Sequence, residues 1–277
     1  MSTKTIKHFI FTRFFPKQDP NYPYDVLDVN FLSTQLALAQ NNELKSLENQ
    51  TNKNFELVFL ANPKYFDDPK YKFVFSTLQD STTLPITFTT MANMPDLVKD
   101  AYEKYEFVIQ SRMDFDDFIY KDAIADTQSK VNECDSVLIY GYNKGYVYVQ
   151  GELYPEYFSK NVTGHQSILQ SLIWKSSFAK KIPFIGIYGS NHWETKFRIK
   201  NFLEENGFKF SESMLQQNKS ANTYIYFRSE FSHYILTHNE GKPVIKAPNR
   251  PKITCNDITK KQLEEEFGFR LKLNSIK

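Results

Sequence analysis

Three short apolar runs, separated by stretches with helical periodicity, constrain the fold of this chain more than any other sequence feature. The apolar runs are residues 6–12, 55–61 and 106–110. Between them, residues 30–48 and 95–105 place apolar side chains at the three- and four-residue spacing of an amphipathic helix. Strands that alternate with helices are typical of a parallel sheet covered by helices. The pattern therefore predicts an α/β fold with a largely parallel sheet.

The second half of the chain is expected to add helices and a hairpin to this sheet. The expected helices cover residues 121–130, 165–180 and 194–205, and residues 221–227 alternate as a strand does. Runs 136–140 and 146–150 flank a turn with two glycines, which predicts a β-hairpin. A basic, proline-punctuated connector, residues 241–252, then leads to an amphipathic helix over about 258–267.

Composition excludes several classes of protein. The 34 basic and 32 acidic residues give a net charge of +2, so we expect no nucleic-acid partner. The nine glycines form no glycine-rich phosphate loop. Cys134 and Cys255 are far apart, which argues against a disulfide framework or a zinc site. No leader and no apolar stretch of about 18 residues stands out, so we expect a cytoplasmic protein.

An acidic cluster follows the third apolar run directly. Asp114, Asp116 and Asp117 lie just beyond the expected carboxyl end of that strand, where open α/β sheets bind their ligands. Alternate carboxylates on an extended segment can share one hard cation, so Asp114 and Asp116 are candidate ligands for Mn²⁺ or Mg²⁺. Such a cation would neutralise a leaving diphosphate. The alternative interpretation is a solvated acidic turn or a helix cap.

Three segments in order resemble a known family. Residues 111–117, Ser-Arg-Met-Asp-Phe-Asp-Asp, resemble the D-x-D-D signature of nucleotide-sugar glycosyltransferases with the GT-A (Rossmann-like) fold. Residues 46–51, followed by 55–57, are similar to the S-L-x-x-Q-T segment of these enzymes. The opening residues 9–14 are similar to the putative rhamnosyltransferase family in particular. The resemblance covers residues 6–120 well, with a weaker match near 189–191.

The resemblance implies roles for residues of the first half. Thr12 and Arg13 would lie at the nucleotide end of the crevice, and Arg112 would also contact the donor. Asp114 and Asp116 would hold the metal and the donor ribose or diphosphate. Asp117 would face the donor sugar, as a candidate catalytic residue, or would support its neighbours.

The chain departs from the family pattern at two places. Related enzymes usually end the second strand with an acidic residue that recognises the base, whereas this chain has Ala61-Asn62. Asn62 is the candidate substitute. The family also tends to place a histidine before the late Gly and Asn, where this chain has Tyr188.

Two histidines and two glutamates are further candidates for the reaction. His192 is the candidate third metal ligand, and a packed histidine beside Trp193 is the alternative. His165 is a candidate general base or acceptor contact, or else a hydrogen-bonding residue at a helix start. Glu152 and Glu194 are rival bases.

Tyrosines crowd the expected hairpin, and sheet packing is the favoured interpretation, with a sugar-binding surface as the alternative. They are residues 140, 142, 146, 148, 154 and 157.

These observations predict a metal-dependent glycosyltransferase that moves a sugar from a nucleotide-diphosphate donor to a glycan, lipid-linked or protein acceptor. A deoxyhexose such as rhamnose is a candidate sugar. The alternatives are a nucleotidyltransferase and a non-catalytic glycan- or partner-binding protein. Residues 1–240 are expected to form the GT-A domain, with a donor half (about 1–120) and an acceptor half (about 121–240), and residues 241–277 a C-terminal helical appendage.

The basic connector has two interpretations as well. The segment Lys242–Lys252 is either a solvated linker or a peripheral contact with the inner face of an anionic membrane. The oligomeric state and the stereochemical outcome of transfer stay open at this point.

Overall fold

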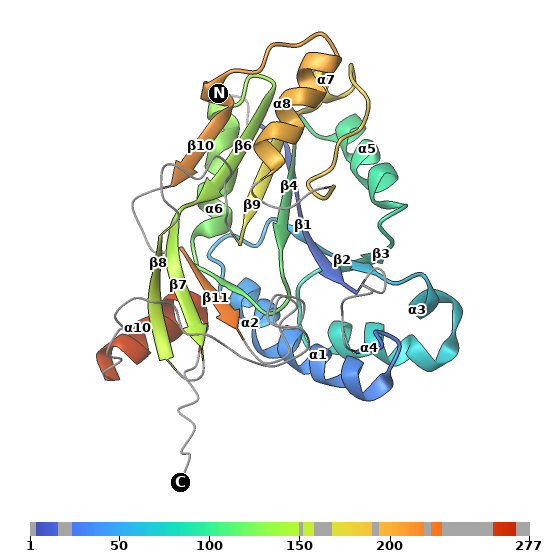
Figure 1. Ribbon diagram of the computed structural model, residues 1–277, viewed down its shortest axis with the longest axis vertical. Coiled ribbons are helices and arrows are strands. Elements are labelled where there is room, and N and C mark those ends of the chain that lie inside the picture. The colour runs from blue at the N-terminus through green and yellow to red at the C-terminus, as the bar shows by residue number, and fades with distance from the viewer. Residues whose placement is uncertain are drawn as a thin grey trace.

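A seven-stranded sheet forms the centre of the computed structural model, which describes residues 4–15, 24–149, 152–157, 168–189, 194–218, 223–228 and 257–269. The strand order is β10-β6-β9-β4-β1-β2-β3 (Figure 1). The strands are β1 (Ile6–Phe14), β2 (Glu56–Ala61), β3 (Ile86–Thr89), β4 (Phe107–Met113), β6 (Val137–Tyr142), β9 (Gln170–Lys175) and β10 (Leu215–Asn218). All neighbours pair in parallel except β9, which is antiparallel to both β4 and β6. The expected α/β fold with a mostly parallel sheet is confirmed.

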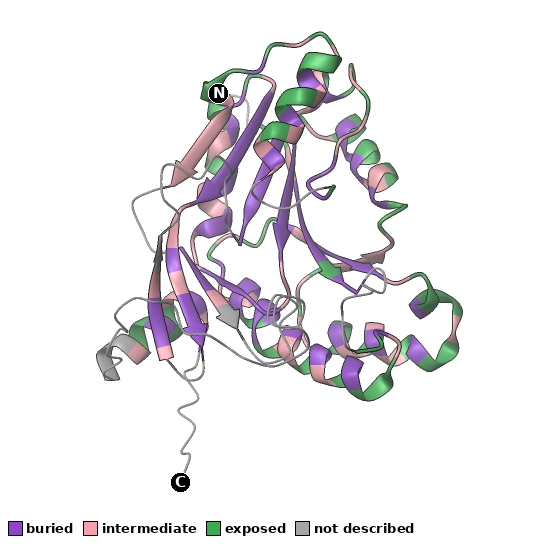
Figure 2. Ribbon diagram, viewed as in Figure 1, coloured by how far each residue is buried: buried purple, intermediate pink, exposed green. Residues whose placement is uncertain are grey.

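Helices cover both faces of this sheet. One face carries α1 (Val29–Asn41), α2 (Glu43–Glu48), α3 (Lys64–Asp67), α4 (Lys72–Asp80) and α6 (Ala123–Ser129), and the other carries α5 (Met94–Lys104), α7 (Ser176–Ala179) and α8 (Thr195–Glu205). Short 3-10 helices are η1 (Pro69–Tyr71), η2 (Lys130–Glu133) and η4 (Glu212–Met214). Because side chains alternate along a strand, Ile10 and Phe14 of β1 join the first apolar cluster and Phe9 and Phe11 the second. The inner strands of the sheet are accordingly buried, the edge strands β3 and β10 are of intermediate burial, and the outer helix surfaces are exposed (Figure 2).

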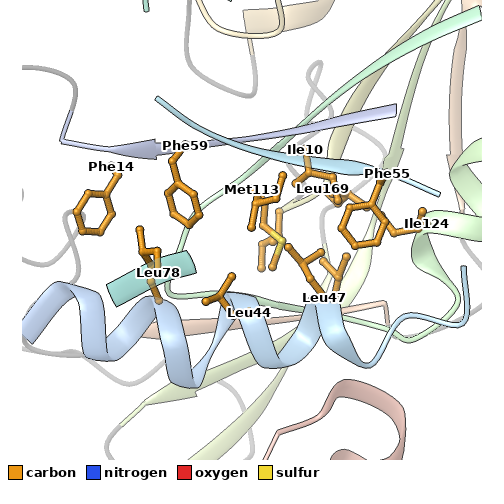
Figure 3. Close-up of a cluster of buried hydrophobic side chains, with 14 of the residues drawn as sticks. Ile10, Phe14, Leu44, Leu47, Phe55, Phe59, Leu78, Met113, Ile124 and Leu169 are labelled. Atoms are coloured by element: carbon orange, nitrogen blue, oxygen red, sulfur yellow. The ribbon is translucent and has the colours of Figure 1, made fainter. Parts of the chain in front are cut away.

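Aromatic and leucine side chains fill the space between β1, β2 and the first group of helices. Phe14 and Phe59 meet edge to face with ring centroids 6.0 Å apart. They point to the side of the sheet on which Leu44 and Leu47 of α2 are buried (Figure 3). This packing fixes α2 close under the carboxyl ends of the first two strands.

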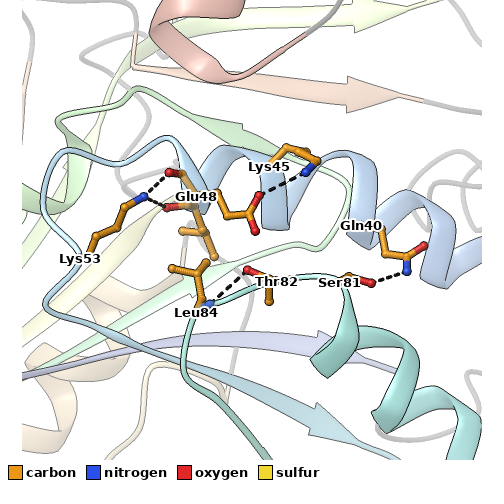
Figure 4. A network of polar contacts seen from close by, with 8 residues as sticks. Gln40, Lys45, Glu48, Lys53, Ser81, Thr82 and Leu84 are labelled. Atoms are coloured by element: carbon orange, nitrogen blue, oxygen red, sulfur yellow. Dashed lines mark hydrogen bonds and ion pairs between the residues drawn. The ribbon is translucent and has the colours of Figure 1, made fainter.

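Polar contacts fix the same helices from their outer side (Figure 4). Gln40 of α1 donates to the Ser81 hydroxyl after α4, and Lys53 donates to the carbonyls of Leu47 and Glu48. A lysine that bonds the last carbonyls of a helix satisfies acceptors that would otherwise lack partners. The end of α2 is thereby tied to the segment that enters β2.

A buried polar network lies inside the main sheet. His8 of β1 is 1% exposed, and its Nδ1 accepts a hydrogen bond from Gln128 at 3.3 Å. Its Nε2 therefore carries the proton and donates to the Ser111 hydroxyl at 2.7 Å, which in turn meets the Ser171 hydroxyl at 2.6 Å. Burial lowers the pKa of His8 to about 3, so the imidazole is neutral at physiological pH.

A smaller sheet and a C-terminal helix complete the described structure. The sheet has the order β5-β11-β7-β8, with β5 (Phe118–Ile119), β11 (Tyr224–Arg228), β7 (Lys144–Val149) and β8 (Glu152–Tyr157). Helix α10 (Asp257–Phe267) packs Leu263 and Phe267 against Phe118 of β5, and Glu266 accepts a hydrogen bond from Lys121 N–H at 2.8 Å. The predicted final helix is confirmed, and it is joined to the segment after the acidic cluster.

The predicted hairpin over residues 136–150 is wrong, although both of its strands exist. β6 belongs to the large sheet, whereas β7 pairs with β8 and β11 in the small one. Gly145 does not serve a turn: a Cβ there would lie 2.5 Å from the Tyr224 ring, so glycine permits the close approach of β11.

The helix predicted over residues 165–180 is also wrong in its described part. Gln170–Lys175 is strand β9, and only the four residues of α7 are helical. β3 was not predicted at all. The helices expected over 30–48, 95–105, 121–130 and 194–205 and the strand over 221–227 are confirmed with small shifts of their bounds.

Candidate functional site

The carboxyl ends of β1, β2 and β4 meet at one edge of the main sheet, because the three strands are parallel. Thr12 of β1 lies opposite Met113 of β4. Asp114 follows β4 directly, and Asn62 follows β2. We call this region the carboxyl edge, the position at which open α/β sheets bind ligands.

The acidic cluster forms a turn at the carboxyl edge. The Asp117 N–H donates to the Asp114 carbonyl at 3.2 Å, and Asn42 Nδ2 donates to the Asp116 carbonyl at 2.8 Å. Asp116 and Asp117 are buried, while the Asp114 side chain is 31% exposed. Burial of two carboxylates argues against the solvated-turn interpretation, since charged groups are costly to bury without a purpose or a partner.

The segment Ser46–Thr51, which carries the S-L-x-x-Q-T resemblance, holds the chain that follows the acidic turn. The Ser46 hydroxyl accepts from Ile119 N–H at 2.7 Å and donates to the Ile119 carbonyl at 3.1 Å. Gln50 donates to the Tyr120 carbonyl at 2.9 Å and accepts from Ile124 N–H at 3.2 Å. The motif is therefore a backbone clamp that positions the acidic turn from α2.

Ser46→Ala is expected to destabilise the protein by about 1–3 kcal/mol, because it leaves the buried Ile119 N–H and carbonyl without their side-chain partner. Chemical denaturation would measure the loss, and hydrogen exchange at the Ile119 amide should quicken. Ser76→Ala is the matched control, since Ser76 is exposed and bonds only carbonyls of its own helix. Equal effects of the two substitutions would contradict the clamp.

Glu43 is a residue of the carboxyl edge that the sequence did not indicate. It is fully buried at the start of α2, and the Thr12 hydroxyl donates to its Oε1. Burial raises the pKa of Glu43 to about 8, against the opposing effect of the Thr12 hydrogen bond. Within the described part of the chain, its Oε2 has no hydrogen-bond partner. In the sequence, a glutamate in the first turn of a short helix is indistinguishable from ordinary helix-end charge.

Asp116 shares this environment. Burial, together with the nearby negative charge of Asp114, raises the pKa of Asp116 to about 8. The charges of Asp114 and Asp116 also act on Glu43 in the same direction. This side of the carboxyl edge is thus short of positive charge.

Two arginines lie on the other side of the carboxyl edge, against one tyrosine ring. The Arg112 guanidinium lies 4.7 Å from the centroid of the Tyr188 ring, and that of Arg13 lies 5.2 Å from it. Arg13 Nη2 is also 3.8 Å from Asp114 Oδ1. Burial lowers the pKa of Arg112, which nonetheless stays charged, as arginine does in proteins.

Strand alternation separates these two groups. Thr12 points with Ile10 and Phe14 toward α2 and Glu43, so its neighbour Arg13 points to the opposite face, toward Tyr188. The carboxyl edge therefore presents carboxyl groups from one face of the sheet and guanidinium groups from the other, with Asp114 between them. Such an arrangement can bind an anionic ligand together with a cation.

The remaining candidates are more dispersed. Asn62 Oδ1 accepts from Lys64 N–H at 3.1 Å, which forms a local Asx turn just before α3. Glu152 lies on β8, an outer strand of the small sheet, with β7 and β11 between it and β5. Its carboxylate accepts the Tyr154 hydroxyl. Glu194 is the N-cap of α8.

The tyrosines near the expected hairpin mostly serve packing, as favoured. Tyr140, Tyr142, Tyr148 and Tyr154 are buried. The Tyr142 hydroxyl donates to the Ala123 carbonyl at 2.8 Å. His165 and His192 lie outside the described residues, as does the connector 242–252.

A divalent cation at the carboxyl edge would need oxygen ligands from the acidic turn. No group of three or more His, Cys, Asp or Glu side chains that could hold a metal ion is found among the described residues. Mg²⁺, however, commonly takes one or two carboxylates and completes its shell with water and substrate phosphates. Asp114 and Asp116, which lie near enough for the charge of Asp114 to raise the pKa of Asp116, supply two hard oxygen donors of that kind. The residues present therefore fit such an ion.

A comparison with known families identifies the family of this chain. Residues 26–222, more than half of the chain, match the family described as putative rhamnosyl transferase. The mostly parallel sheet, covered by helices on both faces, and this match place the chain among α/β proteins of a glycosyltransferase family. The chain belongs to the putative rhamnosyl transferase family. The resemblance seen in the sequence is confirmed.

Solved structures show more distant likenesses. S. aureus TarS 1–349 in complex with UDP is 17% identical, with a TM-score of 0.40 over 85% of this chain and 65% of that one. Mouse xyloside xylosyltransferase 1 is 9% identical, with a TM-score of 0.39 over 77% and 85%. S. aureus TarS itself is 13% identical, with a TM-score of 0.37 over 82% of this chain and 37% of that one. The chain thus spans little more than a third of TarS.

No curated protein sequence matches this chain. Within the described residues, no helix combines the length and the hydrophobicity that crossing a membrane requires.

Proposed function

We propose that this protein transfers a sugar from a nucleotide-diphosphate donor to a glycan, lipid-linked or protein acceptor, and that it uses Mn²⁺ or Mg²⁺ to do so. The observation that carries the proposal is the charge arrangement of the carboxyl edge. Asp114 and Asp116 supply carboxylates there, and Arg13 and Arg112 supply guanidinium groups. A diphosphate with its cation needs both.

Each group has a role in this proposal. Asp114 and Asp116 hold the cation, with Glu43 close behind them as a further buried carboxyl. The cation, when bound, acts as a Lewis acid toward the leaving diphosphate. Arg13 and Arg112 bind phosphate oxygens, for which planar guanidinium groups are well suited. Thr12 and Asn62 lie along the same edge, toward the nucleoside.

The acceptor hydroxyl must lose a proton during transfer. An inverting transfer needs a group that takes the proton of the acceptor hydroxyl. Asp117, His165 and Glu152 are the candidates, and Asp117 is the one within the acidic turn. Its substitution by asparagine should lower transfer while leaving donor and metal binding intact.

Donor binding can be tested without knowing the acceptor. We expect nucleotide-sugars with Mn²⁺ to raise the melting temperature, as ligands of the folded state do. UDP-, GDP-, dTDP- and CMP-sugars should each be measured with and without Mn²⁺. If only free nucleoside triphosphates raise the melting temperature, nucleotidyl transfer is favoured instead. Oligosaccharide binding without cleavage of any donor would favour a binding protein.

The sugar is a separate question. The family description supports a deoxyhexose such as rhamnose as the transferred group. The test is to measure the slow hydrolysis of dTDP-rhamnose and of UDP-glucose under the same conditions and to compare the two rates. We expect dTDP-rhamnose to be hydrolysed faster. Preference for the hexose would contradict it.

A further inference from the structure

Arginine is scarce in this chain, yet it gathers around one short segment. Only six of the 34 basic residues are arginines. Three of them, Arg13, Arg112 and Arg198, contact residues 186–189. Arginine differs from lysine in its planar fork, which stacks on aromatic rings and binds phosphate at two points. The use of arginine around this segment, in a lysine-rich chain, indicates that the planar guanidinium group is needed there.

Tyr188, in the middle of this segment, is fixed from three elements. Its hydroxyl donates to the Phe11 carbonyl of β1 at 2.9 Å. The preceding Ile187 N–H donates to Gln110 of β4 at 3.2 Å. Arg198 of α8 donates to the Gly186 carbonyl at 2.7 Å. The Tyr188 ring is therefore held rigidly beside the carboxyl edge.

The residue after Tyr188 keeps this packing close. Gly189 has a φ of +148°, a conformation that residues with a side chain rarely adopt. A Cβ there would lie 3.1 Å from Arg198 Nη1. Glycine at this position therefore lets the Arg198 guanidinium pack against the backbone that follows Tyr188.

Both arginines of the carboxyl edge rest on this ring. Arg112 is 2% exposed, so its guanidinium is confined, whereas the Arg13 side chain is 45% exposed. Two like charges near each other repel, and the electron-rich face of a tyrosine attracts both. Asp114 lies 3.8 Å from Arg13, and its negative charge also acts on Arg112, so both guanidinium groups have Asp114 as a neighbouring carboxylate.

We propose that Tyr188 is a positioning residue that holds Arg13 and Arg112 as a fixed pair for the diphosphate of the donor. This inference rests on the proposed function, because it names the residue that prepares the phosphate part of that site. The ring orients both guanidinium groups before the ligand binds, so less side-chain conformational entropy is lost on binding. Tyr188 itself acts through the arginines.

Calorimetric titration with UDP, GDP and dTDP in the presence of Mn²⁺ tests the proposal on the full chain, without turnover. For the diphosphate that binds best, Tyr188→Leu and Tyr188→Met are expected to weaken binding about tenfold, because the aromatic face is lost. Tyr188→Phe keeps that face and should stay within about threefold of the wild type. A loss as large in Tyr188→Phe as in Tyr188→Leu would overturn the proposal.

Tyr71 provides a matched control. It is buried, the Lys70 ammonium lies 4.6 Å from the centroid of its ring, and its hydroxyl also donates to one backbone carbonyl, that of Leu27 at 3.0 Å. Tyr71→Leu should destabilise the protein comparably and leave diphosphate affinity unchanged. If it weakens binding as much as Tyr188→Leu does, the effect is one of general packing and the proposal fails.

A double-mutant cycle separates positioning from structural support. Arg13→Lys keeps the charge on a half-exposed side chain, so folding is spared, and it should weaken binding about fivefold through loss of the fork. In the Arg13→Lys background, Tyr188→Met should weaken diphosphate binding less than about fivefold, compared with about tenfold in the wild-type background. The reason is that one of the two arginines that Tyr188 positions is already gone. Full additivity would overturn the inference alone. Failure of the wild type to bind any of the diphosphates would overturn the proposed function and this inference with it.

Discussion

Asp114→Asn and Asp116→Asn are each expected to lower kcat/KM for donor transfer or hydrolysis by about 10²–10³-fold, the usual cost of removing one group that stabilises charge in a transition state. The reason is that each substitution removes a carboxylate donor from the proposed cation site. The Mn²⁺-dependent rise in melting temperature should disappear in the same variants. Steady-state kinetics and thermal shift measure the two effects independently.

An exposed aspartate gives the control for this experiment. Asp100 lies on the outer surface of α5, away from the carboxyl edge, so Asp100→Asn should leave both measurements unchanged. If Asp116→Asn binds Mn²⁺ and cleaves the donor as the wild type does, the metal-centred proposal is wrong.

His8→Gln is expected to remove a large part of the pH dependence of stability below neutrality. The pKa of folded His8 is about 3, whereas unfolded histidine has a pKa of 6.5. Between these values the unfolded state binds the extra proton, so falling pH favours unfolding. From pH 6.5 to pH 4 this linkage costs the wild type about 3 kcal/mol. Urea denaturation of both proteins across that range measures the difference.

The difference in slope is the quantity to compare, because glutamine also alters the network with Ser111 and Gln128. Other titrating groups, including Glu43 and Asp116, are present in both proteins and cancel. Parallel stability profiles for wild type and His8→Gln would show that His8 does not contribute the linkage.

The strands β1, β2 and β4 and the helices α1, α2 and α5 could be predicted because these strands and helices differ in period and length. Residues 170–175 could not, since β9 lies between β4 and β6 and is buried on both faces. A strand without alternation is indistinguishable by periodicity from a buried helical segment. The glycines at 141 and 145 predicted a turn. Gly145 instead makes room for Tyr224, a residue far along the chain that packs directly against it.

The residues of the site also divide into those that local sequence predicts and those that depend on tertiary packing. The acidic turn was predictable because three carboxylates came directly after an apolar strand, and the family motif supported it. Glu43 was not, because its importance comes from burial beneath Thr12, and burial is a tertiary property. Tyr188 was visible only as a departure from the family pattern; its contact with two arginines depends on the register of β1 and β4.

The pairing of β5 has a consequence for synthesis on the ribosome. β5 follows the acidic turn at once, but its partner β11 and the helix α10 that bonds Lys121 come from much later in the chain. During translation the strands of the donor half can pair while the segment after the acidic turn still waits for these contacts. Non-local pairing of this kind forms slowly. A nascent chain would therefore acquire a folded sheet before it acquires a completed site, and ligand affinity should be among the last properties to emerge.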